Sequence, residues 1–127
     1  MRKIVIDMQN YLFADAVATA FKNSDYDIEV IRAESPRDTV ELCQAYEPFA
    51  LVMEVTGYTP WKLSERLKLR DRVRELCPDC KIALMVDSNT ERQTAKDIRD
   101  AKKDGLIDQF FYGSMSAEYL MDQIYAM

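Results

Sequence analysis

The amino-acid sequence predicts an α/β fold, in which one parallel sheet is covered by helices on both faces. Five short apolar runs, typical of buried strands, alternate along the chain with five segments of helical periodicity. The connections between them are short, and strict alternation of strand and helix produces a parallel sheet because the crossovers are right-handed. The 127 residues have the length of one domain, so we expect a single domain over residues 1–127.

The N-terminal part supplies three of the five strands. We predict these strands over Lys3–Asp7, Tyr26–Ala33 and Phe49–Val55. Asn10 can cap the first helix, and Ser35 followed by Pro36 has the N-cap and N1 pattern that begins the second. The apolar positions expected to face inward are Phe13, Val17, Ala20 and Phe21 in the first helix and Val40, Cys43 and Tyr46 in the second.

The third helix has an unusual pattern. Thr59 and Pro60 give a third cap-and-proline signal, and the helix should run to Cys77. At about 100° per residue, Leu69, Val73 and Leu76 share one face, whereas Leu63 and Leu67 lie roughly opposite. Either the helix kinks near Leu67, or its first turns bury a second face.

The C-terminal part supplies the last two strands, which we predict over Lys81–Val86 and Ile107–Tyr112. The helix between them should run from Ser88 to Asp104 and end at Gly105 in the left-handed conformation. Ser114 or Ser116 caps the last helix, whose inward residues should be Leu120, Met121 and Ile124.

Composition and charge exclude several classes of function. The formal net charge of −5 disfavours direct nucleic-acid binding, which needs a basic footprint. No apolar run approaches the ~20 residues of a membrane span, and the N-terminus enters a strand at once, so we expect a cytoplasmic protein without membrane contact. The sequence contains no histidine, which removes His-based acid–base catalysis and the Ser-His and Cys-His nucleophile pairs.

Carboxylates follow three of the predicted strands. Asp7, Glu54 and Asp87 lie near strand carboxyl ends, the edge at which open α/β sheets place ligands and chemistry. Three acids could hold a cation there, or they could form a diffuse acidic rim without metal, which is the interpretation we favour.

Three stretches resemble parts of the receiver domain of two-component response regulators. NYLFADAVATAF resembles the first receiver helix, LVMEV the phosphoacceptor strand, and KDGLIDQFFYGS the final loop and strand. The resemblance covers essentially the whole chain. It implies a flavodoxin-like (CheY-like) three-layer α/β/α fold with strand order 2-1-3-4-5 and five helices, a role in signal transduction, and no output domain in this chain.

The residues that carry receiver chemistry differ at every aligned position. Glu54 falls at the phosphoacceptor aspartate, and Met8 and Gln9 fall at the acidic pair that binds Mg²⁺. Val86 replaces the switch hydroxyl and Gly113 replaces the lysine. We therefore predict a degenerate receiver that is not an enzyme, binds no Mg²⁺ and acts by phosphorylation-independent protein–protein interaction.

Three alternatives stay open for the carboxylates. The chain could be a working phosphorelay receiver that uses Glu54 or Asp7 with a displaced metal site. Glu54 could also imitate a phosphorylated aspartate, with Ser88 in place of the absent switch hydroxyl, or it could simply be a solvated or ion-paired charge.

Cys77 and Cys80 form a CxxC motif, which in an α/β context can indicate a small redox or ligand-binding module. Reactive pairs lie at helix N-termini, where the dipole lowers the thiol pKa, whereas this motif follows the end of a helix. We therefore favour structural, reduced cysteines.

Two surfaces are candidates for a protein partner or a homodimer contact. Lys62, Arg66, Arg70 and Arg74 recur every four residues, with Leu63 and Leu67 between them. This pattern fits either a solvated helix face or a docking strip for an acidic partner. The second candidate is the face of the fifth strand around Phe111 and Tyr112.

Overall fold

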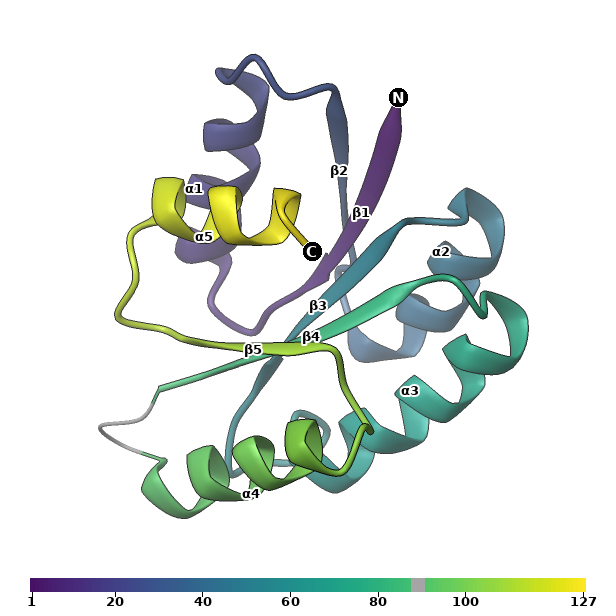
Figure 1. The fold of residues 1–127 in the computed structure, drawn as a ribbon, viewed down its shortest axis with the longest axis vertical. Helices are drawn as coiled ribbons and strands as arrows, with labels where there is room; N and C mark the ends of the chain where they lie inside the picture. The colour runs from purple at the N-terminus through teal and green to yellow at the C-terminus, as the bar shows by residue number, and fades with distance from the viewer. Residues whose placement is uncertain (88–90) are drawn as a thin grey trace.

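The computed structural model of the chain describes residues 1–87 and 91–127, which form a five-stranded parallel sheet of order β2-β1-β3-β4-β5 (Figure 1). The strands are β1 (Arg2–Asp7), β2 (Ile28–Arg32), β3 (Ala50–Val55), β4 (Lys81–Val86) and β5 (Gln109–Tyr112). The helices are α1 (Tyr11–Lys22), α2 (Thr39–Tyr46), α3 (Leu63–Leu76), α4 (Arg92–Lys103) and α5 (Ala117–Tyr125), and a 3₁₀ turn η1 (Pro36–Asp38) precedes α2. The predicted fold class and strand order are confirmed.

The sheet separates two hydrophobic layers. On one face α1 and α5 pack over a cluster that includes Ile6, Val17, Phe21 and Leu120, all at most 2% exposed (Figure 1). On the other face α2, α3 and α4 pack over a second cluster that includes Leu51 and Val73. In the described part of the chain, no helix is both long enough and apolar enough to cross a membrane.

The strand register decides where the carboxylates point. Asp7 pairs with Met53 across β1 and β3, so both side chains lie on the α2–α3 face of the sheet. Successive side chains of a strand point to opposite faces, so Glu54, which follows Met53, points to the α1–α5 face. Asp7 and Glu54 are therefore close along the strand edge but separated by the sheet.

Most of the predicted caps are confirmed. The Asn10 side chain accepts a hydrogen bond from the Phe13 backbone N–H at 3.1 Å, and the Ser116 hydroxyl accepts one from Tyr119 at 3.1 Å. Gly105 has a φ of +78°, as expected for the left-handed residue after a helix. Ser35 caps the 3₁₀ turn rather than α2 itself, because its hydroxyl accepts from the Arg37 N–H. Tyr46, which was expected to face inward, is 41% exposed.

The start of the third helix was predicted wrongly. Pro60 follows a cis peptide bond inside a turn in which the Trp61 N–H donates to the Tyr58 carbonyl at 2.7 Å, so α3 begins only at Leu63. Its end is close to the prediction, but Leu76, the last helical residue, is 47% exposed rather than inward. The expected start of the fourth helix, Ser88, lies outside the described residues; within them α4 begins at Arg92.

Candidate functional site

A buried ion pair occupies the carboxyl edge of the sheet. The Arg66 side chain of α3 is 0% exposed, and its Nη1 lies 2.6 Å from Oδ2 of Asp7, whose side chain is 3% exposed. Arg66 Nη2 also donates to Asp7 Oδ1 at 3.3 Å and to the Asp7 carbonyl at 3.2 Å. The guanidinium thus engages both carboxylate oxygens and the backbone of the last β1 residue.

Two further hydrogen bonds complete this cluster, which we call the Asp7 lock (Asp7, Thr39, Arg66). Thr39 is the first residue of α2, and its hydroxyl donates to Asp7 Oδ2 at 2.6 Å. Arg66 Nε donates to the backbone carbonyl of Glu54 at 2.8 Å. One carboxylate therefore ties α2 and α3 to β1, and the same arginine ties α3 to β3.

The local sequence explains why an arginine is buried there. Val73 is fully buried on α3, and a residue seven positions earlier lies only about 20° away around the helix, so Arg66 faces the same core. A buried guanidinium is tolerated when its donors are satisfied and a charge opposes it, and Arg has the planar fork that matches a carboxylate. The odd pattern of α3 follows from this: Leu63, Leu67 and Leu69 flank the inward Arg66 and pack partly buried against the core.

The Glu54 carboxylate has a different partner on the other face. Its Oε1 accepts a hydrogen bond from the Asn10 backbone N–H at 2.9 Å, just before α1. Asn10 in turn caps that helix through its side chain. Glu54 therefore stabilises the α1 N-terminus, where a negative charge also complements the helix dipole.

The other residues expected in a phosphoacceptor pocket lie as follows. Met8 is 4% exposed and belongs to the α1–α5 core, whereas Gln9 is exposed. Val86 is fully buried in the opposite core. Gly113 lies beside it, and its N–H donates to the Val86 carbonyl at 2.8 Å. None of these positions supplies a carboxylate, a hydroxyl or a cation.

The Mg²⁺ ion that the receiver resemblance implies does not fit these residues. Asp7 and Glu54 lie on opposite faces of the sheet, and both Asp7 oxygens already face a guanidinium. Within residues 1–87 and 91–127, no three His, Cys, Asp or Glu side chains are grouped closely enough to hold a metal ion. Mg²⁺ prefers several oxygen ligands around one point, and a resident cation at Asp7 opposes a second one.

The geometry assumed for the predicted basic strip of α3 is wrong. Arg66 is fully buried, Arg70 donates through Nε to the Leu106 carbonyl at 2.6 Å, and Arg74 pairs with Asp108 at 2.7 Å. Of the four cations in the strip, only Lys62 is exposed to solvent. Leu63 and Leu67, expected between exposed cations, pack against the core instead.

The second predicted partner surface is also partly internal. Phe111 is 2% exposed and belongs to the α1–α5 core, so it cannot lie on an exposed face. Tyr112 is half-buried on the other side of β5, where its ring packs edge-to-face on Phe110 with 5.7 Å between the ring centroids. Its hydroxyl accepts a hydrogen bond from Arg99 of α4 at 3.2 Å.

The three cysteines are free thiols. Burial is the main cause that raises the pKa of both Cys43 and Cys80 to about 12, and partial burial also raises the pKa of Cys77. The Cys77 thiol donates to the Cys43 carbonyl at 3.2 Å. Reactive CxxC pairs have lowered pKa values, so these shifts disfavour a redox role for Cys77 and Cys80.

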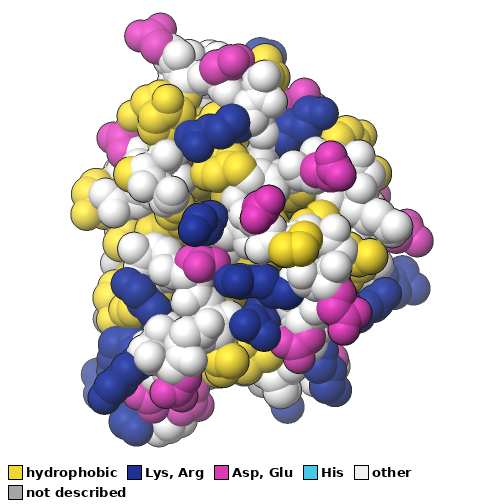
Figure 2. All heavy atoms as spheres, turned by 45° about the vertical axis from the view of Figure 1, so that its right-hand side comes forward, with side chains coloured by type: hydrophobic (Ala, Val, Ile, Leu, Met, Phe, Trp, Pro, Cys, Tyr) yellow, Lys and Arg dark blue, Asp and Glu magenta, His cyan; other side chains and the backbone are white. Residues whose placement is uncertain are grey.

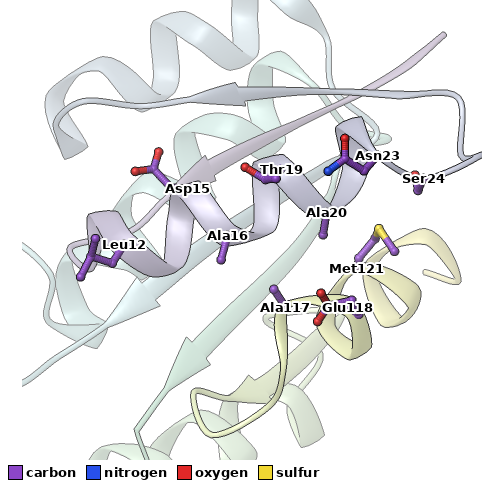
Figure 3. Close-up of a pocket in the computed structure, with 10 residues that line it drawn as sticks. All are labelled: Leu12, Asp15, Ala16, Thr19, Ala20, Asn23, Ser24, Ala117, Glu118 and Met121. Carbon is purple, nitrogen blue, oxygen red and sulfur yellow. The ribbon is translucent and has the colours of Figure 1, made fainter.

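A hollow of the molecule lies away from the Asp7 lock. It is a groove of about 620 Å³ between α1 and α5, with Asp15 and Glu118 near its rim and small side chains along its floor (Figure 3). Asp15 pairs with Arg32 of β2. The groove is separated from Asp7 and Arg66 by the sheet, and its lining brings no acid–base pair together.

Comparisons with known proteins show the receiver fold. A response regulator from Thermotoga maritima superposes with a TM-score of 0.78 at 17% identity, covering 99% of this chain and 96% of that one. A CheY-like receiver domain protein from Methanospirillum hungatei JF-1 gives 0.75 at 12% identity, with 99% and 92% coverage. The CheY-like protein tadZ from Pseudomonas aeruginosa PAO1 gives 0.71 at 14% identity, with 99% and 98% coverage. No family model and no curated protein matches the sequence.

Sequence reasoning named Asp7, Glu54 and Arg66 but did not join the first to the third. Thr39 was not predicted as a site residue, because the second helix was expected to begin at Pro36, which placed Thr39 inside that helix. The signal that could have identified Arg66 is its spacing of seven residues from Val73, which places both on one helix face.

Proposed function

We propose that this chain is an atypical receiver domain in two-component signalling, which acts through protein–protein contacts that do not depend on phosphorylation. The observation that carries this proposal is the Asp7 lock. In a phosphoacceptor, the strand edge must bring together a nucleophilic carboxylate, a metal and a cation that faces the phosphoryl group. Here the only fully buried cation of the described chain neutralises Asp7 and braces the backbone of Glu54.

Glu54 supports the proposal from the opposite face. Its carboxylate is held by the Asn10 N–H, so it is positioned as a hydrogen-bond acceptor for α1 rather than as a free nucleophile. Met8 on the same face is apolar and buried, Val86 is buried in the opposite core, and Gly113 has no side chain to offset charge on a phosphoryl group. In-line transfer tuned to a carboxylate nucleophile loses rate steeply when that group is misplaced by about 1 Å.

The Asp7 lock also supports action by binding. Phosphorylated receivers change shape when a new charge reorganises the strand edge, which requires an element with two arrangements. A guanidinium held by three bonds to Asp7 and one to the Glu54 carbonyl fixes α3 against β1 and β3 in one arrangement. A fixed surface that partners bind directly is the function that this arrangement favours.

The test is phosphorylation of the purified full chain. The protein is incubated with Mg²⁺ and acetyl phosphate in parallel with a control receiver of established phosphoacceptor activity. The mass of each intact protein is then measured by mass spectrometry. We expect an adduct on the control receiver alone. The proposal would be refuted by a phosphoryl adduct on this chain that is lost in the Glu54→Gln variant, in the Asp7→Asn variant, or in both.

A further inference from the structure

A groove lies between η1 and α3 on the α2–α3 face of the molecule. Its volume is about 350 Å³, and Pro60 closes it from the turn before α3. Figure 2 brings the side of α2 and α3 forward, and on this face Lys and Arg side chains (dark blue) lie among hydrophobic (yellow) and acidic (magenta) ones. The lining residues that matter here are Pro36, Arg37, Pro60, Lys68, Leu69 and Arg72.

The groove is locally cationic on an acidic protein. Arg37 and Arg72 are exposed, and within residues 1–87 and 91–127 neither guanidinium makes an ion pair or a hydrogen bond. Lys68 has one partner, Glu65, at 3.4 Å, and Glu65 is the only carboxylate in the lining. Three cations thus face one carboxylate, although the whole chain carries a formal charge of −5.

The groove also offers apolar surface between these charges. Pro36 and Pro60 present rigid rings, and Leu69 is half-buried with one side against the α2–α3 core. Binding to prolines and to a held leucine immobilises few side-chain torsions, so little conformational entropy is lost there.

Both walls of the groove are fastened to the same buried carboxylate. η1 leads directly into Thr39, whose hydroxyl donates to Asp7, and Lys68 and Leu69 follow Arg66 within one helical turn. The Asp7 lock therefore fixes the spacing between the wall that carries Arg37 and the wall that carries Arg72. A preformed site of this kind needs no rearrangement before it binds.

We propose that this groove docks an acidic peptide segment of a protein partner, with carboxylates at Arg37 and Arg72 and an apolar side chain over Leu69. This inference rests on the proposed function, whose binding surface it specifies. Charge complementarity selects a carboxylate-bearing segment, and the apolar floor selects a peptide over a bare anion. Nucleic acid is disfavoured because a run of phosphates would meet the net negative field of the protein outside these three cations.

The test uses the ¹⁵N-labelled full chain and the probe peptide Gly-Ser-Glu-Leu-Glu-Leu-Glu-Ser-Gly. Titration should shift the amide signals of residues 37–38, 65–72 and the residues on either side of Pro60, and added salt should weaken the binding because the charges are exposed. Two matched peptides, one with Gln for every Glu and one with Ser for every Leu, should each bind at least several-fold more weakly.

Charge reversal provides the matched variants. Arg37→Glu and Arg72→Glu should each weaken probe binding about fivefold, the effect of an exposed ion pair worth up to about 1 kcal/mol. Lys103→Glu makes the same change of charge on an exposed lysine at the end of α4 and should leave the affinity unchanged. The inference would be overturned if the probe did not bind, or if the amide shifts were confined to other faces. It would also be overturned if the Ser-substituted peptide bound with equal affinity, or if Lys103→Glu lowered the affinity as much as the two arginine variants do.

The outcome is distinguishable from failure of the proposed function. Phosphorylation at Glu54 or Asp7 would refute the phosphorylation-independent role whether or not the probe binds. If the chain stays unphosphorylated and the probe fails, only the assignment of this groove is wrong.

Discussion

Replacement of Arg66 by methionine tests the Asp7 lock directly. The change removes the positive charge and all four hydrogen bonds of the guanidinium, while an unbranched apolar chain still fills part of the space. Among the residues that the structure describes, Asp7 would keep only the Thr39 hydroxyl as a side-chain donor, with its carboxylate still out of contact with water. A buried charge without its partner is one of the most destabilising changes that a core can undergo.

Breaking a buried ion pair on one side costs about 3–5 kcal/mol, because the remaining charge is left uncompensated. A domain of this size has a free energy of unfolding of roughly 6–15 kcal/mol, so the loss is a large fraction of the total. In thermal unfolding this corresponds to a Tm lower by roughly 10–20 °C. The free energies are measured by urea unfolding followed by circular dichroism at neutral pH.

Two further variants show whether the ion pair is the cause. Arg72→Met removes an exposed arginine of the same helix and should change stability by less than about 0.5 kcal/mol. The triple variant Asp7→Val, Thr39→Val, Arg66→Met removes every charge and hydroxyl of the Asp7 lock and should recover more than half of the loss, since buried ion pairs are often replaceable by apolar groups. An Arg66→Met loss below about 1 kcal/mol, or a triple variant less stable than the single one, would refute the reasoning.

Three further outcomes follow from other parts of the molecule. Burial raises the pKa of both Cys43 and Cys80 to about 12 from an ordinary value of 9.0, so the contribution of these two thiols to stability should be constant below pH 9 and fall as the pH rises toward 12. The Cys43→Ala, Cys80→Ala double variant should show a shallower fall in urea titrations, and parallel pH profiles would contradict this. Glu54→Gln keeps an acceptor for the Asn10 N–H and should keep stability within about 0.5 kcal/mol, whereas Glu54→Ala should lose about 1 kcal/mol; equal losses would argue that the charge itself matters. Gly105→Ala should lose about 1 kcal/mol from backbone strain alone, because its φ is +78° and, apart from its chain neighbours, no atom of the described residues lies within 4 Å of an added Cβ; unchanged thermal unfolding would exclude that strain.

The fold was predictable because several independent local signals agreed. The apolar runs gave the strands, and the side chains of Asn10 and Ser116 gave two helix starts that the structure confirms. Pro60 misled because a proline after threonine is equally compatible with a helix start and a tight turn, and only tertiary contacts select between them. Boundaries of this kind depend on packing that periodicity does not contain.

The candidate site was predictable in composition but not in pairing. Asp7 and Glu54 were correctly placed near strand carboxyl ends, yet their separation by the sheet follows from the pairing of Asp7 with Met53, which no pattern within either strand reveals. Arg66 was assigned to the surface because arginine is mostly exposed, and a buried arginine becomes plausible only when its partner is known. The error therefore came from applying an average preference of one residue type at a position where tertiary pairing reverses it.

Because Arg66 is completely buried, hydrogen exchange of its side chain reports local opening of the protein. Its Nε–H is held by the Glu54 carbonyl and shielded from water, so it exchanges with solvent only when the ends of β1 and β3 separate from α3. In a ¹⁵N spectrum, the Arg66 side-chain signal should therefore persist in heavy water after those of the exposed Arg37 and Arg72 have vanished. Its exchange rate would report how often this edge of the sheet opens in the ¹⁵N-labelled protein, with no substitution introduced.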